Sequence, residues 1–592
     1  MQKIFLSILL CGGFAACNLS GNSADIENNK DLAALFDKYY DERLQLFPLE
    51  ATSIGDNRYN DQMPVDFTDS YREKLGTFYS NYLTYLTKFN REQLNSSDKI
   101  SYDIFKREMD MSVEGLTFHD NYIPLNQFWG LNLNMGQMGS GDGNQPFKTV
   151  QDYENWLKRA TAFSAWADSA VIYFKKGMAA NYVLPKSLVI KMIPQMEAMV
   201  TDSASKSLFY GPVTSMPAGF SDADKTRLTD AYTKLINEQL VPSYKKLAGF
   251  LKNEYLPAAR ATSGISSLPD GDKYYAYLVR QQTTTNKSPE EIYQTGLSEV
   301  ARISSIMDSV KNAAGFKGDM TSFFNFMRND KQFTPYKTPK EVLDAFEAIH
   351  QRMMPNLAKM FKLTPKTGFE IRQTEAFRAA TASAEYNQGT PDGSRPGIFY
   401  VPIIDATKFN TTSGMESLFL HEAIPGHHYQ ISLQQEDTLL PKFRRFGGNN
   451  AYVEGWALYC ESLGKELGLY TDPYQYMGAL GDEMHRAIRL VVDVAIHTKN
   501  MTREEAITYM TDHEAISEEG ATAEIERYMA IPGQALGYKI GALKIKELRS
   551  RYETSLNGKF DIADFHGEIL KDGAMPLELL ETKMNSWAEA KK

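Results

Sequence analysis

The stretch LFLHEAIPGHH, residues 418–428, is the most informative segment of this chain. It holds three of the nine histidines within eight positions, and Glu422 directly follows the first of them. Neutral imidazoles are good zinc ligands, and a neighbouring carboxylate can act as a general base toward water. The stretch is therefore interpreted as an extended form of the His-Glu-x-x-His motif of zinc peptidases.

Pro425 interrupts this motif. A helix is expected over residues 418–424, and Pro425 must break it because proline lacks an N–H and its ring clashes with the carbonyl of His421. The second histidine ligand must then follow the break, and two candidates remain. His427 belongs to a Gly-His pair like that of His-Glu-x-Gly-His enzymes, whereas His428 would share a face with His421 only in an unbroken helix. We favour His427 and keep His428 as the alternative.

A third protein ligand is expected, because catalytic zinc usually has three protein ligands and water. The helical stretch NAYVEGWALYCE, residues 450–461, supplies two acids among aromatic and small residues. Glu454 and Glu461 are seven positions apart and so share one helix face. We predict that Glu454 binds Zn²⁺ and that Glu461 orients a ligand from behind.

A further helix, RAIRLVVDVAIH at residues 486–497, carries Arg489, Asp493 and His497 at intervals of four on an otherwise apolar sequence. One interpretation is a buried network of satisfied ion pairs. The other is a histidine, oriented by Asp493, that donates a hydrogen bond to the oxyanion of a transition state. Both interpretations remain open from spacing alone.

Downstream, Arg527 can bind a substrate carboxylate through two hydrogen bonds, and Tyr538 can donate to developing negative charge. The competing interpretation is a structural turn with core tyrosines. The remaining histidines are isolated and are interpreted as surface or core residues; they are His119, His350, His485, His513 and His566.

The N-terminus resembles a bacterial lipoprotein signal. A short positive start and an apolar run precede small residues and a cysteine, which predicts a signal peptide at residues 1–16 and lipid attachment at Cys17. Cleavage by ordinary signal peptidase is the alternative. Residues 17–30 are expected to form a flexible tether, and residues 31–592 a single helical unit. Of the three cysteines only Cys460 would remain free in the mature chain, so no internal disulfide is expected.

Composition predicts a large core and argues against nucleic acid as a partner, since 43% of 592 residues are hydrophobic and the net charge is −10. Helical periodicity dominates, and Ser288, Thr338 and Thr502 have the pattern of N-caps. The expected helices include residues 67–89, 150–180, 222–255, 289–314, 339–361 and 502–513. The best strand candidate is residues 397–402, where Pro402 favours an edge position.

These motifs together resemble the bacterial DUF885 family over essentially the whole mature chain. The motifs are HEAIPGHHYQ, EGWALYCE, RLVVDVAIH and PGQALGYKIG, with FPLEATSIGD near the start. The resemblance implies a mainly helical, zincin-like fold of the gluzincin type, with two lobes around a cleft and a small β element. It further implies that His421, His427 and Glu454 hold Zn²⁺ and that Glu422 is the general base.

The same resemblance implies roles for three other sites. The strand at residues 397–401 would pair with an extended substrate, which makes Phe399 and Tyr400 substrate-binding candidates. His497 or Tyr538 would stabilise the tetrahedral intermediate. We therefore expect a lipid-anchored zinc peptidase of the bacterial cell envelope that acts on short peptides.

Two alternatives remain: a zinc-dependent hydrolase of another amide or ester, and a non-catalytic metal-binding lipoprotein. Glu422 argues against the latter, because a closed structural zinc site needs no general base.

Overall fold

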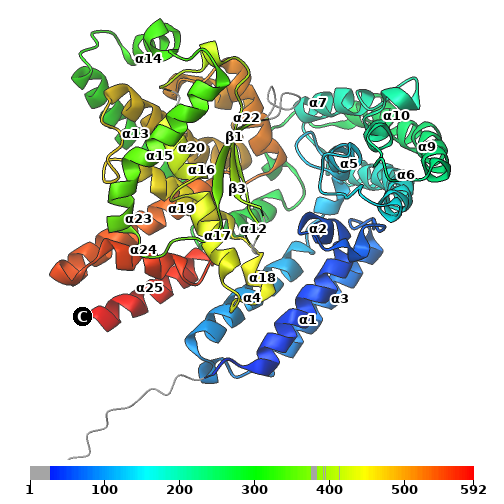
Figure 1. Cartoon of the computed structure of the whole chain (residues 1–592), viewed down its shortest axis with the longest axis horizontal. Coiled ribbons are helices and arrows are strands. Elements are labelled where there is room, and N and C mark those ends of the chain that lie inside the picture. Colours follow the sequence, from blue (N-terminus) through cyan, green and yellow to red (C-terminus); the bar gives the residue numbers. More distant parts are fainter. Residues whose placement is uncertain (1–26, 375–382, 391–392, 394, 413) are drawn as a thin grey trace, which may run out of the picture.

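The computed structural model describes residues 27–374, 383–390, 393, 395–412 and 414–592 (Figure 1). Cys17, the signal peptide predicted for residues 1–16 and most of the predicted tether lie outside the described residues. The prediction of a mainly helical fold with a small β element is confirmed. The gluzincin-type arrangement of two lobes around a cleft stays a prediction. Among the described residues, no helix has the length and apolar character needed to cross a bilayer.

The helices of the N-terminal half are α1 (Lys30–Leu46), α2 (Pro48–Ser53), α3 (Asp69–Leu86), α4 (Ser96–Gly115), α5 (Leu131–Gly139), α6 (Val150–Ala179), α7 (Lys186–Glu197), α8 (Gly211–Thr214), α9 (Asp222–Leu235), α10 (Val241–Phe250), α11 (Leu256–Ala258), α12 (Gly271–Thr283) and α13 (Pro289–Ala313). Those of the C-terminal half are α14 (Met320–Asn329), α15 (Pro339–Met360), α16 (Met415–Glu422), α17 (His427–Glu436), α18 (Lys442–Arg445), α19 (Asn450–Ser462), α20 (Pro473–Thr498), α21 (Arg503–His513), α22 (Glu518–Ala530), α23 (Leu536–Leu556), α24 (Ile562–Leu570) and α25 (Leu577–Lys591).

The predicted helix starts are confirmed where capping chemistry marked them. Ser288 and Thr502 each accept a hydrogen bond from the third residue of α13 and α21, and the glutamate at that position bonds back to the cap. At the start of α15, Thr338 also accepts from the Glu341 N–H, but the Glu341 carboxylate accepts from the Lys337 N–H instead of from the cap. Local hydrogen bonds to otherwise unpaired N–H groups therefore account for these boundaries.

The β element is a three-stranded sheet in the order β1–β3–β2. β3 (Gly397–Val401) pairs in parallel with β1 (Phe369–Gln373) and antiparallel with β2 (Glu385–Asn387). The prediction that residues 397–401 form an edge strand is therefore wrong. Pro402 lies just beyond the last residue of β3, so its missing N–H removes no ladder hydrogen bond.

Two hydrophobic cores lie on either side of α20. The first gathers α1, α3 and α4 with the sheet, α16, α19 and α23, and the second gathers α6, α7, α9 and α10 with α13 and α22. α20 contributes Leu490 and Val494 to the first core and Val491 and Val492 to the second. In Figure 1, α6, α7, α9 and α10 form a group on the right, apart from the larger group around the sheet. From Ala487 to His497, helix α20 is buried on all sides, as the apolar sequence of this part requires.

Candidate metal centre

The break between α16 and α17 is built around Pro425 and Gly426. α16 ends at Glu422 and α17 begins at His427, so the predicted interruption falls where Pro425 requires it. A Cβ on Gly426 would lie 1.9 Å from the carbonyl oxygen of His421, so only glycine fits this close approach. The Trp456 indole N–H donates to the Pro425 carbonyl over 2.8 Å and ties the break to α19.

His421, His427 and Glu454 meet across this break. Their ligand atoms all lie within 4.8 Å of one another. The Nε2 atoms of His421 and His427 are each 3.5 Å from Oε2 of Glu454. Zinc bonded to N and O at about 2.0–2.1 Å separates two tetrahedral ligand atoms by about 3.3 Å. Glu454 Oε2 is buried and has no hydrogen-bond partner. Two nitrogen ligands around an unsatisfied carboxylate oxygen fit a zinc ion in composition and spacing.

Glu461 lies behind His421 on the same face of α19 as Glu454. Its Oε1 is 2.7 Å from His421 Nδ1, the ring nitrogen that points away from the cluster. Histidine ligands of metals usually donate their second N–H to a carboxylate in this way, which fixes the tautomer and the ring orientation. α19 packs closely on α23 through Gly455 and Gly541. A Cβ on Gly455 would lie 2.5 Å from the Cα of Gly541.

Burial and mutual charge shift the pKa values at this site. Burial lowers the pKa of His421, but the carboxylates of Glu454 and Glu461 outweigh it and hold that pKa well above its usual value. Burial also acts to raise the pKa of Glu454, yet His421 and His427 hold it well below its usual range. The site therefore favours the charged form of the Glu454 carboxylate, which a metal cation would pair with.

Glu422 ends α16 beside the cluster. Burial raises its pKa, and the positive charges of His421, His427 and Arg486 offset part of that effect. A carboxylate with a raised pKa accepts a proton more readily near neutral pH, as a general base requires.

His428 points away from the cluster. Its Nδ1 lies 3.1 Å from the Tyr386 hydroxyl on β2, and its ring packs 5.0 Å from that of Phe369 on β1. Burial lowers the pKa of His428 to about 4. The structure thus brings His427, and not the alternative His428, to His421 and Glu454.

Asp493 and His497 do not form the predicted pair, and the prediction that Asp493 orients His497 is wrong. Asp493 accepts from the Tyr275 hydroxyl and the Gly533 N–H. His497 Nδ1 accepts from the Ile265 N–H, and its Nε2 donates to the Tyr528 carbonyl. Both ring nitrogens are therefore occupied and the residue is fully buried, so His497 has no N–H for an oxyanion.

Arg527 and Tyr538 lie on α22 and α23, and among the described residues no hydrogen bond, ion pair or ring contact joins either to the cluster. Arg527 Nη2 donates to Gln534 Oε1 over 2.9 Å, while its buried Nε has no partner. The Arg489 guanidinium packs over the Tyr538 ring at 4.9 Å.

In the sheet, Phe399 is fully buried against Phe346 and Phe419, so the prediction that it contacts substrate is wrong. Tyr400 is half-buried.

Arg486 and Trp456 were missed as site residues. The Arg486 guanidinium acts on both Glu422 and Glu461, and it lines a cavity of about 480 Å³ together with His485. The signal was present in the sequence, because Arg486 lies three positions before Arg489 on the apolar helix and Trp456 lies two after Glu454.

Fold and site define a large, mainly helical protein with a partly buried histidine–glutamate cluster of metal-binding composition. The chain belongs to DUF885, a bacterial protein family of unknown function, whose model matches residues 48–584. The predicted family is thereby confirmed.

The solved structures that are similar to this chain include those of two proteins described as candidate lipoproteins. A candidate lipoprotein from Colwellia psychrerythraea is 28% identical, with a TM-score of 0.86 over 95% of this chain and 99% of that one. A candidate lipoprotein of unknown function from Shewanella oneidensis is 19% identical, with a TM-score of 0.73 over 94% of this chain and 99% of that one, a likeness of fold alone. No curated protein matches the chain.

Proposed function

We propose that this protein is a zinc-dependent hydrolase, and that it cleaves short peptides. The observation that carries the proposal is the meeting of His421, His427 and Glu454, with Glu461 behind His421. Glu422 follows His421 at the end of α16 and interacts with the charges of both histidines. A purely structural zinc site needs four protein ligands and no base. Three ligand atoms and an adjacent carboxylate are the donor set of a catalytic site.

The bound zinc ion would supply Lewis acidity, polarising the scissile carbonyl and lowering the pKa of water. Glu422 takes a proton from the attacking water and passes it to the leaving amine. Glu461 holds the His421 ring through the 2.7 Å contact to Nδ1. The nearby positive charge of Arg486 opposes part of the rise that burial gives to the pKa of Glu422.

We place the protein in the bacterial cell envelope, anchored through lipid on Cys17. The signal-like residues before Cys17 support this, and both similar structures belong to candidate lipoproteins. The substrate proposed is a short peptide rather than nucleic acid, in keeping with the net charge of −10.

The metal content of purified protein tests the proposal. Residues 18–592 of the wild type should hold about one zinc per chain, as should a control with the exposed His119 replaced, His119→Ala. His421→Ala should hold almost none. A folded wild type that stays metal-free after zinc is added would overturn the assignment and leave a binding lipoprotein as the better interpretation.

A panel of short peptides, simple amides and esters then distinguishes the classes of hydrolase. Zinc-dependent cleavage of peptides alone supports a peptidase. Cleavage of the small amides or esters in their place would reassign the substrate while keeping the zinc chemistry.

A further inference from the structure

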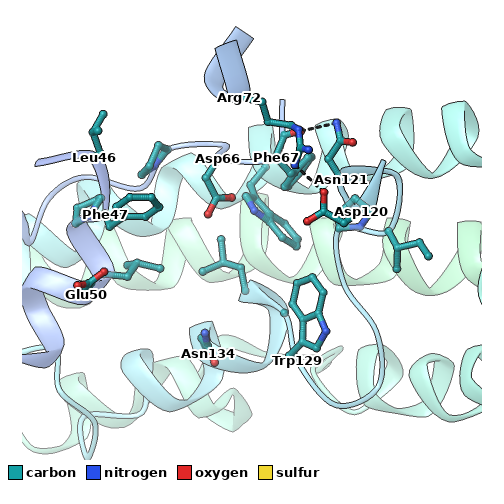
Figure 2. Close-up of a pocket in the computed structure, with 18 of the residues that line it drawn as sticks. Leu46, Phe47, Glu50, Asp66, Phe67, Arg72, Asp120, Asn121, Trp129 and Asn134 are labelled. Carbon is teal, nitrogen blue, oxygen red and sulfur yellow. Dashed lines mark hydrogen bonds and ion pairs between the residues drawn. The ribbon is translucent and has the colours of Figure 1, made fainter. Parts of the chain in front are cut away.

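A second cavity lies at the junction of the N-terminal helices and α6, among residues to which the proposed hydrolysis gives no role. Its volume is about 480 Å³, within the range of small-molecule sites. Its lining comes from the start of α2, the loop that includes Asp66, the segment between residues 120 and 134, and Trp166 on α6. Figure 2 shows Asp66 and Asp120 on one side of this cavity and Trp129 and Asn134 on the other.

The charges around this cavity leave one carboxylate without a counter-ion. Glu50 is paired with Arg43 at 2.7 Å, and Asp120 with Arg72 at 2.8 Å. Among the described residues, Asp66 has no lysine, arginine or histidine as a partner. The Asp66 side chain is exposed where it lines the cavity, so its carboxylate can pair directly with a cation that enters.

Aromatic rings form much of the remaining lining. Phe47, Phe67 and Trp166 contribute, and Phe128 and Trp129 stand at the opening with 49% and 45% of their surface exposed. The Arg527 guanidinium packs over the Phe128 ring at 5.5 Å, so this part of the lining already holds one cation. The faces of aromatic rings attract cations, most strongly when the cation is removed from water.

The loop that carries these two rings is rigid. The buried Asn126 accepts hydrogen bonds from the N–H groups of Phe128 and Trp129 at 2.8 Å each, and it donates to the Ala530 carbonyl on α22. Gly130 then turns the chain with φ of +151°, where a Cβ would lie 2.6 Å from that of Leu125. The exposed rings are thus held in place before any ligand arrives, which lowers the entropy lost on binding.

We propose that this cavity binds an aliphatic ammonium or guanidinium group, with Asp66 as its counter-ion and Trp129 packed on its apolar part. A lysine side chain, an arginine side chain and a peptide N-terminus all present this chemistry. Neutral ligands would leave Asp66 unpaired, and anions would be repelled by it.

Calorimetric titration of the soluble chain tests the proposal with n-butylammonium, n-butylguanidinium and alaninamide, which represent these three sources. Neutral n-butanol is the matched probe without charge. We expect at least one of the cations to bind in the millimolar range, at least tenfold more tightly than n-butanol. The cation that binds most tightly shows whether the cavity prefers a lysine side chain, an arginine side chain or a peptide N-terminus.

Asp66→Asn keeps the shape of the side chain and should weaken cation binding by at least tenfold. Trp129→Ala, at an exposed position, should weaken it severalfold without unfolding the protein. The control is Asp230→Asn, at an exposed position on α9, and it should bind as the wild type does. The proposal is overturned if no cation binds at 20–50 mM (about the weakest range that calorimetry measures), if n-butanol binds equally well, or if both folded variants bind as the wild type.

Discussion

Two sets of buried polar residues suggested chemistry from sequence, and the structure treats them in opposite ways. His421, His427 and Glu454 face one another, and Glu454 Oε2 has no hydrogen-bond partner. Asp493 and His497 each have a partner for both of their polar ends. Buried polar groups whose bonds are complete hold a fold together, whereas converging groups with incomplete bonds indicate a ligand. The four predictions that follow test this contrast.

The largest expected effect is on catalysis. Glu422→Gln removes the proposed base while keeping the side chain's shape, so kcat should fall by about 10²–10⁴-fold. Zinc content should stay at the wild-type level, because Glu422 is not among the proposed ligands. Steady-state kinetics and metal analysis of the same preparation measure both quantities. A variant with full activity would remove Glu422 from the mechanism.

The next largest effect is expected from Glu461, which contacts the proposed ligand His421. Glu461→Gln should weaken zinc binding by about 10–100-fold, since it disturbs the bond that orients His421. Competition against a chelator of known affinity measures the zinc dissociation constant. Glu466→Gln, at an exposed position just beyond α19, is the control and should leave that constant unchanged. Equal affinities in the two variants would contradict the role of Glu461.

Substitutions in the second set, Asp493 and His497, should change the stability of the protein rather than its zinc content. His497→Ala leaves the Ile265 N–H and the Tyr528 carbonyl buried without partners, which should lower the free energy of unfolding by about 3 kcal/mol. Its zinc content should match that of the wild type. Urea titration beside His119→Ala gives the comparison. Loss of zinc from a folded His497→Ala protein would mean that the two sets are coupled.

The smallest effect is a dependence of stability on pH. Burial lowers the pKa of His497 and of His566 to about 3 each, from an ordinary value of 6.5. Below pH 6.5 these two histidines therefore bind protons in the unfolded chain, whereas in the folded chain they bind them only near pH 3. These two histidines therefore lower the free energy of unfolding as pH decreases through this window, and they act against the buried Asp493 carboxyl, whose pKa burial raises to about 7. Thermal melts at pH 7.5 and 5.5 measure it, and the slope should be shallower in His497→Ala.

Local chemistry accounts for what was predicted correctly. Caps at Ser288 and Thr502 depend on neighbours within one turn, and so does the helix break at Pro425. Glu454 and Glu461 lie on one face of α19 because helical geometry alone places residues seven apart together.

Non-local contacts account for the failures. β3 became a central strand because β1 and β2, from segments with little strand pattern, pair with both of its edges. Asp493 and His497 do not bond to each other, because their polar atoms form hydrogen bonds with residues 265, 275, 528 and 533 instead.

Sequence by itself determined the family, the helical class and the candidate metal ligands, because helix periodicity, capping and motif spacing are properties of neighbours along the chain. Only the tertiary structure decided that His427 rather than His428 turns toward Glu454, and that Asp66 faces an aromatic cavity without a counter-ion. The direction that the chain takes after a helix break and the pairing of charged side chains both depend on packing between distant segments. Spacing along the sequence does not specify that packing.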